Sequence, residues 1–271
     1  MKPVRPDFDR PPLIEQAITA VFDRLDQFSI GDFGLFWSEI KDRFSVTEAQ
    51  QPLDPRIEQF EGFRPERVTF RLLDANTLPR CFYRSEDGTE VLQVQPDRFT
   101  YNWQKGEEDY PHSEATMDRF RMLFAKFCEF VMDRGWGPLN ITQCELVNLN
   151  IIPVEDFGET FADAAEAAFC IPRPSVPMEN LPAESYILNN QHLIMHEGEP
   201  AGRLYVQLSP VLRTEDDQKA YRLELTARGA PFGGTDGTMP FFELARYAVN
   251  LGFLGATTER ARKFWGEKHN G

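Results

Sequence analysis

The same order of strand and helix patterns occurs twice in this 271-residue chain. This repetition restricts the possible folds more than any other feature of the sequence. A strand pattern begins at Leu13 and again at Cys144, and each is followed by a helix, three or four strands and a long helix. A Trp-Gly pair follows each half, at Trp136 and at Trp265. This order predicts one duplicated α+β unit, although α+β chains also alternate in this way without a common origin.

The first half begins with a strand and a helix. Residues 13–22 alternate apolar and polar side chains, as in a half-buried strand, and residues 29–44 carry apolar side chains every three or four positions, as in a helix. Pro52, Pro55 and Pro65 exclude a regular element in the next stretch, which we expect to cross the surface. Turn residues then separate four short strands of an expected antiparallel meander, at residues 67–73, 80–83, 90–95 and 99–103.

A long amphipathic helix from Ser113 to Val131, stopped by Gly135, closes the first half. The second half has the same kinds of pattern, with a proline-rich link after its first helix. In chain order we expect a strand at 144–152, a helix at 159–169, strands at 185–195, 202–208 and 220–226, and a helix at 240–254.

The two halves are not joined by a flexible tether, because residues 141–152 have the character of a buried strand and no Gly/Ser-rich linker occurs. We predict a lead-in over residues 1–12 and two repeats, 13–137 and 138–271, in one compact pseudo-twofold body. The predicted fold class is α+β, with antiparallel sheets that are continuous or face each other and helices packed on one side. A groove along the pseudo-axis would suit a ligand or a partner segment.

The chain is strongly acidic, with 29 basic and 43 acidic side chains and a formal charge of −14. This charge disfavours free duplex nucleic acid and anionic membranes as partners, and it favours a protein with a basic face. We find no signal peptide or membrane-spanning run and expect a cytoplasmic location. Four widely spaced cysteines without a Cys-x-x-Cys pair predict buried free thiols at Cys81, Cys128, Cys144 and Cys170.

Sequence motifs of catalysis are missing from the chain. It has no Gly-x-Ser-x-Gly, no phosphate-binding or dinucleotide-binding glycine motif and no His-Glu-x-x-His. We expect no cofactor and no metal: His192 and His196 are four residues apart in a strand pattern, on one face, but lack a third ligand. We interpret the glycine-rich stretch 233–237 as a flexible loop rather than an anion site.

Two strand faces are candidates for binding. Residues 92–105 combine amides, aromatic rings and cations that suit a peptide backbone, a base edge or a carboxylate. The alternative is a structural hairpin whose aromatic row enters the core while its amides bind neighbours. The second candidate face carries Arg222, Glu224, Thr226 and Arg228. The alternative is that these side chains only form a row of salt bridges across the strands. The candidate binding residues are Gln93, Gln95, Arg98, Asn102, Trp103, Lys105, Arg222 and Arg228.

Three segments carry a resemblance to a known family. They are Pro-Pro-Leu-Ile-Glu-Gln-Ala-Ile at 11–18, Leu-Gln-Val-Gln-Pro-Asp-Arg-Phe-Thr-Tyr-Asn-Trp at 92–103 with Tyr110-Pro111 after it, and the closing helix, turn and Trp-Gly at 241–266. In these the chain resembles an uncharacterised bacterial family of sporadic distribution, from which Gln16 is a slight departure. The resemblance brings no activity, and the patchy distribution implies a role in bacterial conflict.

Three hypotheses of function follow from these patterns. The first is a non-catalytic acidic interaction protein, an accessory, immunity or antitoxin-like subunit of a bacterial defence system, because charge is high and catalytic motifs are missing. The second is a sensor that binds a small molecule in the groove between the halves. The third is an enzyme with an unfamiliar site, which would have buried titratable groups clustered in a pocket.

Overall fold

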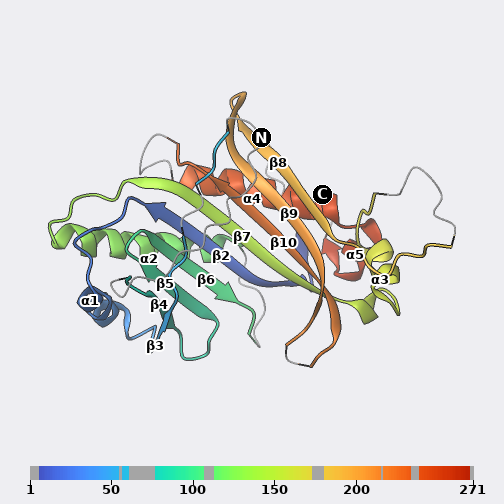
Figure 1. Ribbon diagram of the computed structural model, residues 1–271, viewed down its shortest axis with the longest axis horizontal. Coiled ribbons are helices and arrows are strands. Elements are labelled where there is room, and N and C mark those ends of the chain that lie inside the picture. Colours follow the sequence, from blue (N-terminus) through green and yellow to red (C-terminus); the bar gives the residue numbers. More distant parts are fainter. Residues whose placement is uncertain are drawn as a thin grey trace.

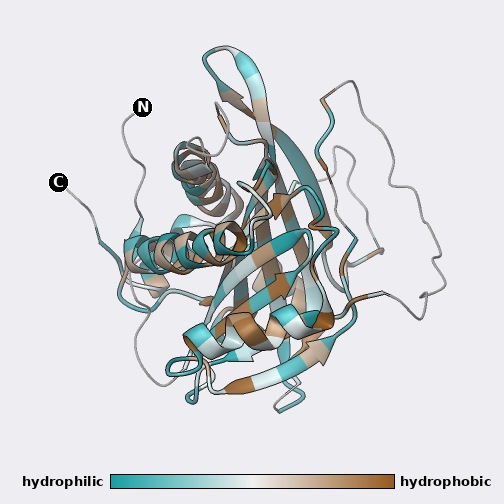
Figure 2. Ribbon diagram, turned by 90° about the vertical axis from the view of Figure 1, so that its left-hand side faces the viewer, coloured by the Kyte–Doolittle hydropathy of each residue, from teal (hydrophilic) through white to brown (hydrophobic). Residues whose placement is uncertain are grey.

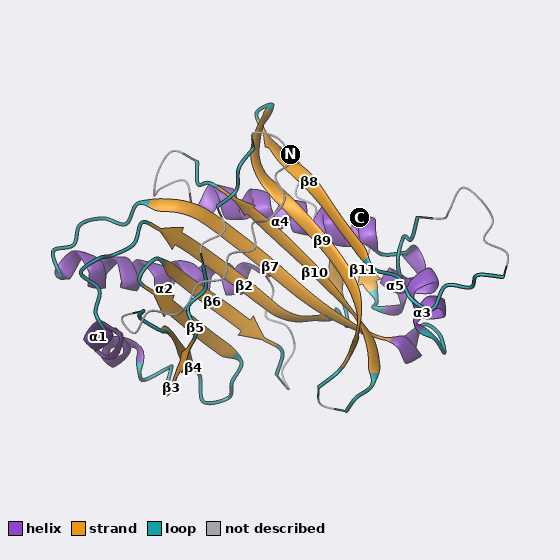
Figure 3. Ribbon diagram, viewed as in Figure 1, coloured by secondary structure: helices purple, strands orange, loops and turns teal. Residues whose placement is uncertain are grey.

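The computed structural model describes residues 6–54, 57–60, 77–106, 113–172, 180–214, 216–232 and 238–268. It confirms a mixed α+β fold built on a nine-stranded sheet in which every neighbouring pair is antiparallel (Figures 1 and 3). A separate two-stranded sheet pairs β1 (Asp7–Phe8) with β11 (Glu267–Lys268). The strand predicted at 67–73, the Tyr110-Pro111 pair and the loop predicted at 233–237 lie outside the described residues.

The elements of the first half are close to those predicted. Its helices are α1 (Ile30–Ile40) and α2 (Ser113–Asp133). Its strands in the large sheet are β2 (Leu13–Phe22), β3 (Val46–Gln50), β4 (Arg80–Arg84), β5 (Glu90–Gln95) and β6 (Arg98–Gln104). The strand β3 was not predicted, because its five side chains are all exposed and show no apolar alternation. Arg98, predicted in a turn, is the first residue of β6.

The second half contributes four strands to the same sheet. These are β7 (Ile141–Pro153), β8 (Leu188–His196), β9 (Glu199–Leu212) and β10 (Lys219–Gly229). A 3-10 turn, η1 (Val154–Asp156), follows β7, and the helices are α3 (Phe161–Ala168), α4 (Thr238–Ala256) and α5 (Glu259–Phe264). The short helix α5 was not predicted, since six residues are too few for a clear periodic signal.

The strand order is β3-β4-β5-β6-β2-β7-β10-β9-β8. The first strands of the two halves, β2 and β7, pair at the centre, with Ile18 opposite Leu146. In the first half, β6 lies next to β2, and β5, β4 and β3 follow toward the edge. In the second half, β10 lies next to β7, and β9 and β8 follow toward the other edge. The strands of both halves therefore form one continuous sheet rather than two facing sheets.

The core lies between one face of the sheet and the helices; the long helices α2 and α4 run behind the sheet in Figure 1 and lie on one side of it in Figure 2. In the first half, Phe36 of α1, Phe99 of β6 and Phe127 of α2 are fully buried, and two pairs of their ring centroids lie 5.2 Å apart. In the second half, buried Tyr221 of β10 packs against Phe169. Burying each such ring contributes about 1.5–3 kcal/mol. The other face carries no described helix, and we call it the open face.

Candidate functional site

A pocket of about 570 Å³ lies on the helix side of the sheet, between α4 and the strands β8 and β9. Its lining is mostly apolar, and it includes Leu188, Ile194, Leu204, Val206, Leu244 and Leu251. All the residues that line it belong to the second half, so this pocket is not the groove between the halves that the sequence predicted. Pockets of this size hold small organic molecules or the side chains of a bound peptide.

Two glycines of α4 shape the pocket. A Cβ at Gly252 would lie 2.8 Å from Leu204 Cδ2 and 2.9 Å from Leu225 Cδ2, so glycine lets the helix approach the sheet closely there. One turn of chain later, a Cβ at Gly255 would meet no atom within 4 Å. The helix is thus held against the sheet at Gly252, while the space beside Gly255 stays open to the pocket.

The strand that borders the pocket, β8, is an edge of the sheet. It pairs with β9 on one side only, and its other side pairs with no strand in the described part of the chain. Every side chain of β8 except Leu188 and Ile194 is exposed, and Leu193 and Met195 are exposed by 53% and 43%. An edge strand presents a row of unpaired N–H and C=O groups, onto which another extended chain can add.

The surroundings of this edge are acidic. Glu184 precedes β8, and Glu197 and Glu199 lie at its turn into β9. All three are exposed, and residues 180–202 contain no Lys or Arg. The edge therefore presents negative charge at both of its ends.

Ionisable side chains also reach the pocket. Cys170 lines it and is exposed, because it follows the end of α3 and lies beside the pocket. The prediction of four buried thiols is therefore wrong: Cys144 is buried, whereas Cys81 and Cys128 are half-buried at positions that pack against the edge of the core. His192 lines the pocket as well and is exposed, whereas the ring of His196 stacks on Phe232 at 4.4 Å. Burial raises the pKa of the Cys81 and Cys128 thiols to about 11, and it raises the pKa of Cys144 further.

The open face carries rows of polar side chains that continue from strand to strand. In one row, Thr19 of β2 lies between Thr100 of β6 and Glu145 of β7. Beyond Glu145, the row continues with Arg228 of β10 and then Arg203 of β9. Thr19 and Thr100 are hydrogen-bonded through their hydroxyl oxygens, 2.9 Å apart. Alternation along each strand produces such rows, because every second side chain points to the same face.

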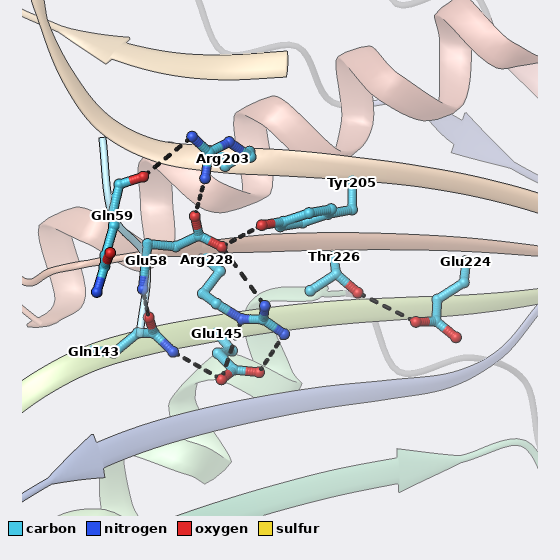
Figure 4. A network of polar contacts seen from close by, with 9 residues as sticks. All are labelled: Glu58, Gln59, Gln143, Glu145, Arg203, Tyr205, Glu224, Thr226 and Arg228. Carbon is cyan, nitrogen blue, oxygen red and sulfur yellow. Dashed lines mark hydrogen bonds and ion pairs between the residues drawn. The ribbon is translucent and has the colours of Figure 1, made fainter. Parts of the chain in front are cut away.

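A network of ion pairs occupies the second-half end of this face (Figure 4). Glu58, whose side chain is 6% exposed, contacts Arg203, accepts a hydrogen bond from the Tyr205 hydroxyl and lies 3.6 Å from an Arg228 nitrogen. Arg228 also pairs with Glu145 at 3.3 Å. Burial and the hydrogen bond to Glu58 raise the pKa of Tyr205. The two arginines are therefore neutralised by two carboxylates in a largely dry setting.

Glu58 belongs to a segment that crosses the open face, residues 51–54 and 57–60, which we call the strap. Near one end, the Gln95 amide accepts a hydrogen bond from the Leu53 N–H at 2.7 Å and donates one to the Leu53 carbonyl at 3.1 Å. Near the other end, the Glu58 N–H donates to the Gln143 side chain at 2.7 Å. The strap corresponds to the surface excursion predicted from its prolines, and buried amides of the sheet hold it in place.

The structure separates the residues of the predicted hairpin site. Gln93, Gln95, Arg98 and Asn102 share the open face, where Gln93 donates to Asn102 at 2.7 Å. Trp103 is 5% exposed and, like Phe99 and Tyr101, lies on the helix side. Lys105 follows the end of β6 and is exposed. This arrangement agrees with the structural alternative, in which the aromatic row enters the core and the amides bind neighbours.

The second predicted face also lies on the open side. Arg222 contacts Glu224, and Thr226 Oγ1 donates to Glu224 at 3.4 Å. Only Arg228 of this face joins the Glu58 network. The sequence pattern did not reveal Glu58, Glu145, Arg203 or Tyr205, because their ion pairs and hydrogen bonds join segments that are 83 to 170 residues apart in the chain.

No family model matches the chain, and no curated protein matches it. The resemblance to a sporadically distributed bacterial family therefore stays a prediction. The described residues include no group of three His, Cys, Asp or Glu side chains placed to hold a metal ion. Within the same ranges, no helix has both the length and the apolar character needed to cross a bilayer.

The buried titratable cluster and the apolar pocket lie on opposite faces of the sheet. The cluster contains Glu58, Glu145, Arg203, Arg228 and Tyr205, and the pocket lining contains none of them. Each carboxylate of the cluster pairs with an arginine, and among the described residues no serine, cysteine or histidine takes part in its contacts. These contacts connect the strap to the strands β7, β9 and β10.

Proposed function

We propose that this protein is a non-catalytic interaction protein that binds an extended segment of a partner protein along β8, with apolar side chains in the adjacent pocket. The observation that carries the proposal is the position of the pocket, which lies directly beside an edge strand without a second neighbour among the described strands. Addition of a strand to a sheet edge beside a helix is a recurring way to bind peptides.

In this binding mode, the backbone and the side chains make different contributions. The unpaired groups of β8 would supply main-chain hydrogen bonds, and every second side chain of the added strand would face α4. Each apolar side chain that leaves water for the pocket contributes about 1.5–3 kcal/mol. Exposed Leu251 of α4, which lines the pocket, would be covered at the same time.

The charge of the edge indicates which partners fit. Glu184, Glu197 and Glu199 flank β8, and the whole chain carries −14, so a segment with basic flanks would associate faster than an acidic one. An accessory, immunity or antitoxin-like role in a bacterial defence system stays part of the proposal, and it rests on the resemblance and the charge.

We also propose that the two halves arose by duplication around a pseudo-twofold axis between β2 and β7. Supporting this is the strand order, since each half runs outward from its first strand in the same sequence of elements. The divergence of the two edges is consistent with one specialised binding edge. On the first half, the strand β3 lies beyond β4, the counterpart of β8, so the two halves end in different edge strands.

A random 12-residue peptide library displayed on phage tests the binding proposal with the purified full chain. We expect the selected peptides to alternate apolar residues and to carry Lys or Arg at their ends. Leu251→Lys and Gly255→Leu should weaken a selected peptide by about tenfold or more, because they charge or fill the pocket. Hydrogen exchange should slow along residues 188–196 when the peptide binds.

Matched controls are available on α1. Leu35 is exposed by 48%, close to the 43% of Leu251, and a Cβ at Gly34 meets no atom within 4 Å, as at Gly255. Leu35→Lys and Gly34→Leu should leave peptide affinity unchanged. Failure to select alternating peptides, or equal losses in the control variants, would reject the β8 site.

A small-molecule sensor is the second candidate, favoured by the pocket volume of about 570 Å³. Its site would be the pocket under α4. Such a ligand would need no basic group and would leave the outer side of β8 unprotected from hydrogen exchange. Shielding of Cys170, which lines the pocket, would report its binding.

A further inference from the structure

Arg98 of β6 is a buried arginine without a described counter-ion. Its side chain lies on the open face, and the residue is 8% exposed. Its Nε has no hydrogen-bond partner, as is also true of Arg80 and Arg228. Unlike Arg228, which pairs with Glu58 and Glu145, Arg98 has no carboxylate of the described residues within ion-pair distance. A buried cation is costly unless an anion or several acceptors surround it.

A second arginine lies beside it. In the pairing of β4 with β5, Cys81 lies opposite Val94, so Arg80 lies opposite Gln95. Gln95 in turn pairs with Arg98 of β6. Arg80 donates to Gln93 Oε1 at 3.0 Å, while its Nε is buried without a partner. Burial and the charge of Arg98 lower the pKa of Arg80, as expected for two neighbouring guanidinium groups.

The other half of the sheet illustrates what such an arginine requires. Arg228 lies on β10, next to the central strand β7, just as Arg98 lies on β6, next to the central strand β2. Arg228 faces Glu145 across its strand pair and also meets Glu58 of the strap, whereas Arg98 faces Val21. The described chain therefore provides carboxylates at one end of the open face and none for Arg98 at the other.

We infer that Arg80 and Arg98 form a binding site for an oxyanion, a phosphate or carboxylate group of a ligand, on the open face beside the strap. A guanidinium presents its N–H groups in a planar fork that matches two oxygens of either group, and two such forks would share the charge. The amides of Gln93 and Gln95 border this site. It lies on the face opposite the β8 pocket and is independent of the peptide-binding proposal.

Thermal unfolding of the full chain in sodium phosphate, sodium acetate and sodium chloride at equal ionic strength tests the site. We expect phosphate or acetate to raise the midpoint in proportion to the logarithm of its concentration, and chloride to raise it less. The larger of the two responses identifies the group that binds. Arg98→Gln and Arg80→Gln should weaken the response about tenfold or more.

Arg84→Gln is the matched control, because Arg84 lies on the same face of β4 but pairs with Glu48 at 3.5 Å. It should keep the full response. If Arg98→Gln does not fold, the wild-type chain is titrated with phosphate and with acetate instead, and the arginine Nε–H groups are followed by NMR. The signals of Arg98 and Arg80 should then shift most. Equal stabilisation by all three salts, an unchanged response in a folded Arg98→Gln variant, or unshifted Nε–H signals would overturn the inference.

Discussion

At the scale of single residues, two arginines of the open face have different surroundings. The same residue type, arginine, is neutralised by Glu58 and Glu145 at position 228 and has no described carboxylate at position 98. Arg98 was a predicted binding residue because it adds a fixed charge to a segment rich in amides and aromatic rings, and the amides of Gln93, Gln95 and Asn102 share its face. It also included Trp103, which the alternation of β6 turns to the helix side. Strand alternation was readable from the sequence, but the counter-ions, which come from distant segments, were not.

The four thiols should differ in reactivity toward iodoacetamide at pH 8. Cys170 is exposed and should react first. Cys81 and Cys128 should react slowly, because burial raises the pKa of each to about 11 and leaves little thiolate, and Cys144, fully buried, should react last. Mass spectrometry of peptides from a time course measures this order.

A ligand in the pocket under α4 should slow the alkylation of Cys170 and leave the rates of Cys81 and Cys128 unchanged, since only Cys170 of these three lines the pocket. Reaction of Cys144 before Cys170 would contradict the described burial.

At the scale of elements, the strap is held by a few polar contacts rather than by apolar packing. Its proline content predicted a surface path, yet the path over the open face depends on Gln95, Gln143 and the Glu58 network. The sequence offers no local signal for these contacts, since each joins the strap to a strand at least 42 residues away. The helices and the long strands were predictable because their apolar periodicity is local.

Glu58→Gln should destabilise the protein by about 1–3 kcal/mol, because it removes a carboxylate from two largely buried arginines. Urea unfolding followed by circular dichroism measures the change. Glu48→Gln is the control: Glu48 pairs with Arg84 on the same sheet face, its side chain is 45% exposed, and its loss should cost less than about 0.5 kcal/mol. Equal effects of the two substitutions would show that the Glu58 network does not hold the strap.

At the scale of the whole molecule, one antiparallel sheet joins both halves and buries an aromatic core on a single face. The α+β class, most of the elements and the antiparallel pairing were predictable, because they follow from periodicity and turn residues. The pairing of β2 with β7 and the position of the pocket were not, because both depend on how distant segments pack.

The burial of weak acids in this core predicts lower stability in alkali. Burial raises the pKa of Tyr83 and Tyr101 in the folded protein, and the pKa of Cys81 and Cys128 moves from 9.0 to about 11. The folded state therefore keeps protons that the unfolded chain releases, so this contribution to stability is complete below about pH 9 and is lost as the pH rises to 11 and above.

Urea unfolding should give a free energy of unfolding that decreases from about pH 7.0 to pH 9.0 and to pH 10.5. The decrease above about pH 9 should be the larger of the two. Cys128→Ala should reduce the dependence on pH between 9 and 11, because it removes one of the shifted groups. Constant stability across this range would contradict the burial of these side chains.

The small ladder between β1 and β11 brings the two ends of the described chain together. Asp7 pairs with Lys268, Phe8 pairs with Glu267, and Lys268 Nζ lies 3.4 Å from an Asp7 carboxylate oxygen. A linker of a few residues would close the polypeptide into a ring there. Such a ring, reopened between α2 and β7, would yield a circular permutant in which the second half is synthesised first while every strand keeps its neighbours.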